Sequence, residues 1–180
     1  MDIALNGSVR KNKQSKDTQK ENEEKSDDKS EKSVSAEASA TGKGTVYEDA
    51  SGNKYEKIDG TPAWRNNNPG NIRDGEFAKN HGAIGEANGF AVFPDERTGM
   101  GAVRSLLQTN TYQNLNLGDA ISRYAPSSEN NTAAYQNFVQ RGTGISLDTS
   151  MRGLNNSQIQ AIADVIRQYE GWREGRIIRY

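Results

Sequence analysis

The sequence predicts a small, mainly helical α+β domain that follows a disordered, charged leader. Aromatic and branched aliphatic residues concentrate between Trp64 and Tyr180, and roughly 120 residues are enough for one modest core. Within that stretch, apolar residues recur at helical spacing in four segments. We therefore expect a leader at residues 1–44, a small hairpin and linker at 45–60, and the main domain at 61–180.

The leader is predicted from its composition. Residues 10–44 are mostly Lys, Glu, Asp, Ser, Gln and Ala, with no aromatic residue and almost no branched aliphatic one. Such a segment cannot bury enough apolar surface to offset the entropy lost on ordering. Its nearly balanced charges are typical of a flexible tether rather than of an arm that binds nucleic acid. The first five residues lack the basic start and long apolar segment of a Sec signal, so we expect none.

Composition also restricts the chemistry. The chain has no Cys, a single His and a net charge of −1. Thiol catalysis, disulfides and Cys-ligated metals are excluded, and His81 alone cannot form a multi-His metal site. The charge argues against a general nucleic-acid binder, and no apolar stretch reaches the roughly 18 residues of a membrane span. Carboxylates, hydroxyls, Asn and Arg must carry any chemistry, and we expect no metal and no cofactor.

The extended segments are expected early in the chain. Residues 45–47 and 54–58 flank a Ser-Gly-Asn turn, which predicts a hairpin. Residues 71–73 and 90–93 are further short extended segments, separated by a Gly-rich loop.

Four helices are expected after these strands. Each begins near a residue whose side chain can accept a backbone N–H bond, and Pro126, Gly142 and Gly171 end the last three. In order, the helices run from Asp95 to about Gln108, from Leu117 to Tyr124, from Asn131 or Thr132 to Gly142, and from Asn155 or Asn156 to Tyr169.

Glu170 is the first candidate catalytic residue. It continues the spacing of Ile162 and Ile166, so its carboxylate extends the apolar stripe of its helix rather than the wet face. It also ends that helix, where the helix dipole disfavours negative charge. Both features favour the protonated carboxyl that a general acid needs. The ordinary alternative is a last-turn Glu paired with a nearby Arg.

Glu129 is the second candidate. It lies in the polar run 124–132 between two expected helices, where substrate-contacting residues are common. The same run is ordinary capping sequence, because Asn131 or Thr132 can accept backbone N–H bonds and Glu129 would lie near the positive helix end. Both interpretations remain open.

Residues 65–73 are the densest polar cluster in the domain. Pro69 and Gly70 suit the centre of a type II turn, and Asn tolerates turn geometry, so the run needs no function. Its four Asn and two Arg nevertheless offer the amide and guanidinium groups that bind sugar hydroxyls and N-acetyl carbonyls. Several aromatic residues are expected in the core or along a groove wall: Trp64, Phe90, Phe93, Tyr112, Tyr124, Tyr135 and Trp172.

These motifs resemble a family of small virion-associated proteins of bacteriophages and prophages. Residues 65–73, which contain Asn-Asn-Pro-Gly-Asn-Ile-Arg, and residues 89–93 match its first block. Residues 124–135 and 161–171 are similar to the next blocks, in the same order. The resemblance covers residues 64–172. This sequence departs from the family pattern at Gly171, which directly follows Glu170 where many members of the family have Asn.

More distantly, the chain resembles peptidoglycan hydrolases of the lysozyme superfamily. The Asn-rich run is similar to a strand of flagellar-type glucosaminidases, and residues 166–171 are similar to the segment around the catalytic Glu of phage-type lysozymes. In the glucosaminidases that Glu ends a helix before the Asn-rich strand, whereas no helix-borne Glu precedes Asn66 here. A circularly permuted lysozyme-like domain would bring Glu170 beside the Asn-rich run.

The resemblance implies a glycosidase that cleaves peptidoglycan, with Glu170 as general acid and Glu129 as a second carboxylate or as the acid in its place. Without a second carboxylate in reach, a route like that of lytic transglycosylases is implied. A non-catalytic peptidoglycan-binding or structural virion module is the alternative. We also expect the protein to reach the periplasm without a Sec signal. Its expected partner is a cognate immunity protein or a component of the secretion system or virion. The residues implied to bind the glycan are Asn67, Asn68, Asn71, Arg73, Tyr124, Thr132 and Tyr135.

Overall fold

A computed structural model describes residues 32–180, so residues 1–31 of the expected leader lie outside the described part of the chain. The rest of that leader is ordered. Strand β1 (Ser33–Ala38) pairs antiparallel with β2 (Gly44–Asp49) and parallel with β4 (Gly85–Ala87). The leader boundary at residue 44 is therefore wrong. Composition missed β1 because its backbone hydrogen bonds come from strands that other parts of the chain contribute.

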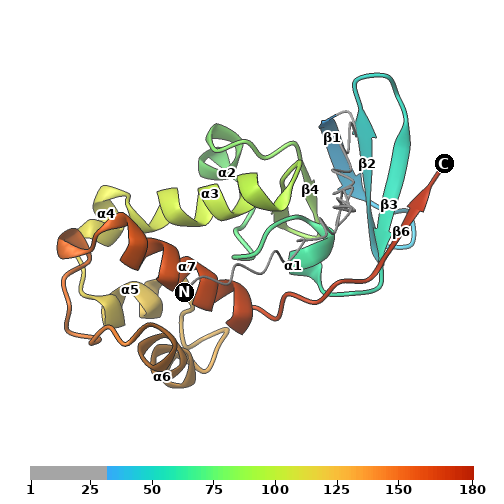
Figure 1. Ribbon diagram of the computed structural model, residues 1–180. Coiled ribbons are helices and arrows are strands. Elements are labelled where there is room, and N and C mark those ends of the chain that lie inside the picture. Colours follow the sequence, from blue (N-terminus) through green and yellow to red (C-terminus); the bar gives the residue numbers. More distant parts are fainter. Residues whose placement is uncertain (1–31) are drawn as a thin grey trace, which may run out of the picture. The chain divides into compact units, whose positions relative to one another are not determined.

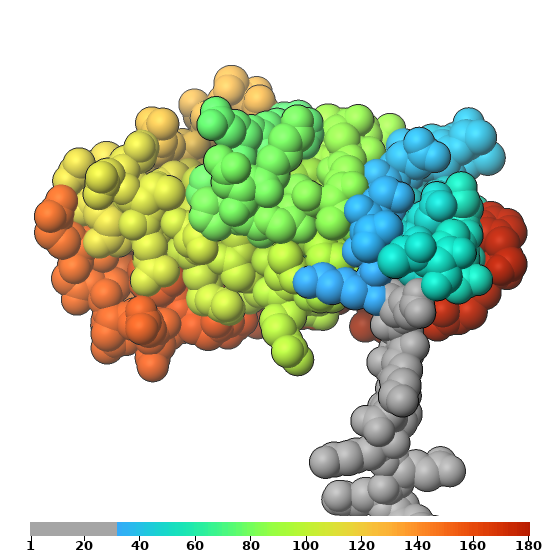
Figure 2. Space-filling model, turned by 90° about the horizontal axis from the view of Figure 1, so that it is seen from above, coloured from blue at the N-terminus to red at the C-terminus, as the bar shows by residue number. Residues whose placement is uncertain are grey.

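The strands form one six-stranded sheet in the order β5-β4-β1-β2-β3-β6. The expected hairpin is present as β2 and β3 (Lys54–Ile58), but it lies within the sheet and is not a separate linker. Strand β5 (Phe90–Val92) lies at one edge and β6 (Arg176–Arg179), which was not expected, at the other. Figure 2 shows the blue first strand, the cyan hairpin and the red C-terminal strand gathered at one end.

The four expected helices are confirmed as α3, α5, α6 and α7. Asp95, Asn116, Asn131 and Asn155 each accept a backbone N–H bond at the first turn of these helices. Short helices that the spacing did not reveal lie before and between them. The helices are α1 (Pro62–Arg65), α2 (Glu76–Asn80), α3 (Glu96–Leu107), α4 (Asn110–Gln113), α5 (Leu117–Tyr124), α6 (Thr132–Thr143), the 3-10 helix η1 (Met151–Gly153) and α7 (Asn156–Tyr169).

One helix end differs from the sequence prediction. Helix α6 continues through Gly142 and ends at Gly144, which has a left-handed φ of +71°. Gly142 serves helix packing instead, because a Cβ there would lie 2.8 Å from Val165 Cγ2 on α7. The close approach of α6 to α7 depends on that missing side chain.

The main core lies among α3, α5, α6 and α7, which gather away from the sheet (Figure 1). Its largest fully buried side chains include Phe93, Leu107, Ile121, Tyr135 and Ile162. A smaller cluster lies against the sheet around Tyr47 and Val92. The α+β class is therefore confirmed for residues 32–180. No helix in that range combines the length and apolar character that crossing a bilayer requires.

Candidate functional site

The inner part of the Asn-rich turn is held together by its own side chains. Asn68 is 0% exposed, and its Nδ2 donates to the carbonyl oxygens of Ile72 and Ala91 at 2.8 and 2.9 Å. Its Oδ1 accepts from the backbone N–H of Ile72 at 2.9 Å. Asn67 and Asn71 adopt left-handed φ values of +50° and +46°, which Asn tolerates better than bulkier residues. The repeated Asn residues are therefore needed for the turn itself.

The sheet supports this turn through Lys57 of β3. The Lys57 ammonium is buried and donates to the carbonyl oxygen of Trp64 at 3.1 Å and to Asn67 Oδ1 at 2.6 Å. Burial lowers the pKa of Lys57 to about 8. Asn67 Nδ2 donates to the Phe93 carbonyl at 3.0 Å. Because the amides of Asn67 and Asn68 are buried and bonded within the protein, the prediction that they bind a glycan is wrong.

Glu170 lies directly after the last turn of α7, and its carboxylate reaches the outer end of the turn. Asn71 Nδ2 donates to Glu170 Oε2 at 2.8 Å. The hydroxyl of Tyr135, on α6, donates to Glu170 Oε1 at 2.8 Å. Each carboxylate oxygen thus accepts one hydrogen bond, so the orientation of this half-buried side chain is fixed by two separate elements. Residues 99 positions apart in the sequence meet here.

Tyr135 acts behind Glu170 rather than in the open cleft. Its side chain is fully buried and stacks on Tyr169, with ring centroids 3.8 Å apart. Burial, and then the negative charge of Glu170, raise the pKa of Tyr135 far above its usual value, so its hydroxyl remains a donor at neutral pH. The prediction that Tyr135 contacts the glycan is wrong, and the structure makes it a positioning residue for Glu170.

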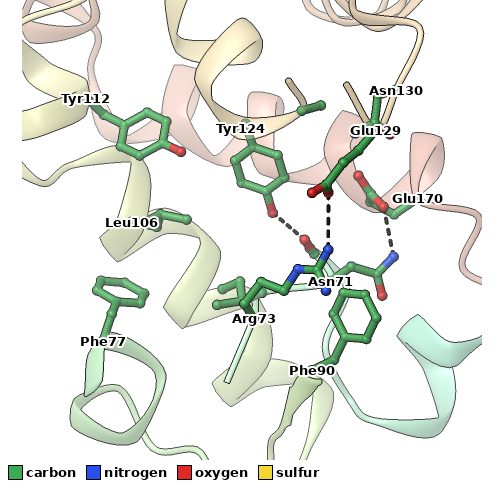
Figure 3. A pocket seen from close by; sticks show the side chains of 13 residues that line it. Asn71, Arg73, Phe77, Phe90, Leu106, Tyr112, Tyr124, Glu129, Asn130 and Glu170 are labelled. Carbon is green, nitrogen blue, oxygen red and sulfur yellow. Dashed lines mark hydrogen bonds and ion pairs between the residues drawn. The ribbon is translucent and has the colours of Figure 1, made fainter. Parts of the chain in front are cut away.

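A cleft of about 390 Å³ opens beside Glu170 (Figure 3), within the range of ~300–1,000 Å³ that small-molecule sites occupy. Polar side chains gather at the Glu170 end, and aromatic and aliphatic side chains lie at the other. The polar side chains are Asn71, Arg73, Glu129, Asn130 and Glu170, with Phe90 beside Arg73, and the side chains at the other end are Phe77, Leu106 and Tyr112, with Tyr124 between the two groups.

Glu129 and Arg73 form an ion pair at the rim of this cleft. Arg73 Nη2 lies 3.1 Å from Glu129 Oε2, and both side chains are more than half exposed. The Arg73 guanidinium also lies 4.8 Å from the ring centroid of Phe90. An exposed pair of this kind contributes about 0–1 kcal/mol, so a ligand can displace it.

Two further candidates, Tyr124 and Thr132, use their hydroxyls to donate hydrogen bonds to backbone carbonyls. Tyr124 presents its ring to the cleft while its hydroxyl donates to the Gly70 carbonyl at 2.6 Å. Thr132 does not line the cleft. Its hydroxyl donates to the Ala125 carbonyl at 2.7 Å, which joins the start of α6 to the end of α5. The structure therefore does not bring Thr132 to the cleft, and its contact with the glycan stays a prediction.

Among the predicted site residues, the structure brings Asn71, Arg73, Tyr124, Glu129 and Glu170 to one cleft. Sequence analysis missed Phe77, Leu106 and Asn130. Phe77 and Leu106 carried no signal because each is a single apolar residue without a ligand-binding pattern around it. Asn130 directly follows Glu129 in a loop already singled out, so the loop's polarity could have indicated it.

A comparison with protein-family models gives no match for this chain, and a search of curated proteins gives none. The argument for a function therefore depends on the geometry of the cleft and on the motifs in the sequence.

Proposed function

We propose that this chain cleaves the glycan strands of peptidoglycan and that Glu170 is the general acid. The observation that carries this proposal is the Glu170 carboxyl, held by Asn71 and Tyr135 at the polar end of the cleft. A fixed carboxyl beside an open, partly aromatic groove is what protonation of a glycosidic oxygen requires. The motifs around Glu170 and the Asn-rich turn support the choice of peptidoglycan as substrate.

In this mechanism Glu170 gives its proton to the glycosidic oxygen and is later reprotonated, so its neighbours must tolerate both forms. Asn71 Oδ1 is buried and has no hydrogen-bond partner among residues 32–180. Either orientation of the amide therefore leaves one of its polar atoms unpaired. The Asn71 amide can donate to the carboxylate and, after a 180° turn, accept from the protonated carboxyl.

Glu129 is proposed as the second carboxylate because it lines the same cleft as Glu170. Its only ion pair among the described residues is the exposed one with Arg73, which a ligand can displace. A carboxyl separation of about 5–5.5 Å in the substrate complex gives a retaining route, and about 6.5–9.5 Å gives an inverting one. If Glu129 does not take part, the substrate's own groups assist, as in lytic transglycosylases. The end groups of the products distinguish these routes.

The proposal includes a circularly permuted lysozyme-like arrangement of the helical region. Its support is that α7 comes after the Asn-rich turn in sequence, while Glu170, directly after that helix, contacts the turn. The resemblance to phage proteins supports delivery as a virion-associated lysin or as an injected antibacterial effector. An effector of that kind would require an immunity protein in the producing cell.

Mass spectrometry of purified sacculi digested with the full chain tests the proposed activity. We expect new glycan ends, either reducing sugars or anhydro ends, and no newly freed amino groups. Free amino groups without glycan ends would identify a peptidase or amidase and overturn the proposal.

The alternative function is non-catalytic binding of peptidoglycan. One observation favours it: both oxygens of Glu170 already accept hydrogen bonds from the protein itself. A binding module would sediment with sacculi and release no fragments from them. Co-sedimentation together with fragment release therefore supports the enzyme, and co-sedimentation alone supports the module.

A further inference from the structure

A second hollow, of about 510 Å³, shares side chains with the cleft, and these side chains lie at the end of the cleft away from Glu170 (Figure 3). The two hollows share three side chains, so they are neighbours on the same part of the chain. The shared residues are Phe77, Leu106 and Tyr112, and Thr109, Thr111 and Arg123 complete the second hollow.

The charge of this second hollow is positive. Arg123, near the end of α5, is exposed and forms no ion pair with any residue of the described chain, and no acidic side chain lines the hollow. The charge of Arg123 acts on Tyr112, since it opposes the burial that raises the pKa of that hydroxyl. By contrast, Arg73 at the other end of the cleft is paired with Glu129.

We propose that this second hollow, the Arg123 subsite, binds a carboxylate of the peptide stem that branches from a peptidoglycan strand. This inference rests on the proposed function. A neutral sugar offers a guanidinium single hydrogen bonds but no opposite charge, whereas a stem peptide offers carboxylates that Arg can bind through two parallel hydrogen bonds. The hydroxyls of Thr109 and Thr111 suit peptide groups, and Phe77 and Leu106 suit the stem's methyl groups.

The test is the binding of an N-acetylated stem tetrapeptide with free carboxylates to the full chain, followed by NMR. The peptide has no glycosidic bond, so binding is measured independently of cleavage. We expect shifts at the backbone amides of Thr109, Thr111 and Tyr112, and we expect Arg123→Gln to weaken binding about five-fold. Arg97→Gln, which removes an exposed arginine outside both hollows, is the matched control and should bind like the wild type.

The charge of the ligand gives a second arm. The same peptide with its carboxylates amidated should bind the wild-type chain about five-fold more weakly and should not distinguish it from Arg123→Gln. Equal binding of the acidic peptide by the wild type and Arg123→Gln, or shifts confined to other residues, would overturn the Arg123 subsite.

Cleavage of sacculi separates this inference from the function on which it rests. Arg123→Gln should lower the preference for peptide-bearing over peptide-free glycan strands about five-fold. Cleavage of both strands with an unchanged preference overturns the subsite alone. No cleavage of either strand by the wild type overturns the proposed function, and with it the assignment of the peptide as part of a substrate.

Discussion

The inner and outer ends of the Asn-rich turn use the same residue type for opposite purposes. Asn68 is sealed in the protein and has both ends of its amide bonded to the backbone. Asn71, three residues later, lines an open cleft and donates to a carboxylate from the far end of the chain. The role of an Asn is therefore set by whether its hydrogen bonds are used within the turn. Substitutions at the two ends should affect different properties.

The largest expected change in stability comes from Asn68→Ala. This substitution leaves the Ala91 carbonyl and the Ile72 N–H without Asn68 as their partner, at about 1–3 kcal/mol each, while the Ile72 carbonyl still accepts from the Ala91 N–H, so we expect a loss of about 2 kcal/mol or more in the free energy of unfolding. Asn71→Ala should lower the free energy of unfolding by about 1 kcal/mol or less, and its main effect should be a loss of activity. Urea denaturation of both variants checks the contrast, and equal losses of stability would contradict it.

The pH dependence of stability tests the support that the sheet gives to the inner end. Burial lowers the pKa of Lys57 from its usual 10.5 to about 8. Between these values the unfolded chain binds the proton and the folded chain does not, so stability rises with pH. We expect the wild type to gain about 2 kcal/mol relative to Lys57→Met between pH 8 and 10.5.

Urea denaturation of the two proteins at several pH values in that window makes this comparison. The tyrosines with raised pKa are present in both proteins, so their contribution cancels in the difference. A constant difference between the two curves would mean that burial does not lower the pKa of Lys57 in the folded chain.

At the outer end, Tyr135→Phe removes one of the two donors to Glu170 without opening a cavity. We expect kcat on sacculi to fall about ten-fold, the equivalent of about 1.4 kcal/mol, with KM little changed because Tyr135 does not face the cleft. Steady-state kinetics make the measurement. A rise in KM with kcat preserved would show that Tyr135 contacts substrate directly.

The smallest expected effect on stability comes from the rim. Arg73→Gln breaks an exposed ion pair with Glu129, so the free energy of unfolding should fall by about 1 kcal/mol or less. Binding of soluble glycan fragments should weaken at the same time, because Arg73 lines the cleft. Thermal denaturation and titration calorimetry check the two outcomes, and a large loss of stability with unchanged glycan binding would show that Arg73 is structural.

The parts of the fold that sequence predicted are those governed by local rules. Asp95, Asn131 and Asn155 cap helices because a side chain bonds to a backbone group a few residues on. The predicted end of α6 at Gly142 was wrong because Gly142 lies within the helix and allows close packing on α7. The local sequence does not reveal that contact. Strand β6 was missed for the same reason, since its partner β3 is distant in sequence, whereas β1 pairs with the nearby β2 and was missed because its residues are mostly small or polar.

Prediction of the site had the same limit. Polarity identified the Asn-rich turn but could not tell Asn68 from Asn71, because burial of the inner end depends on neighbours such as Ala91 that lie far along the chain. Glu170 was singled out because its helical spacing and its motif both indicated it, and in the structure it lines the cleft. Leu106 could not be found, since a single Leu in a helix is ordinary core sequence until the cleft beside it is known.

The most direct measurement is the release of soluble fragments from purified sacculi by the wild type, Glu170→Gln and Glu174→Gln. Glu174 is an exposed carboxylate that does not line the cleft, so it controls for the loss of one negative charge near the end of α7. Loss of the general acid should lower the rate about 10²–10⁴-fold in Glu170→Gln and leave Glu174→Gln at the wild-type rate, with both variants folded by circular dichroism. Undiminished release by folded Glu170→Gln would show that this carboxyl does not cleave glycans.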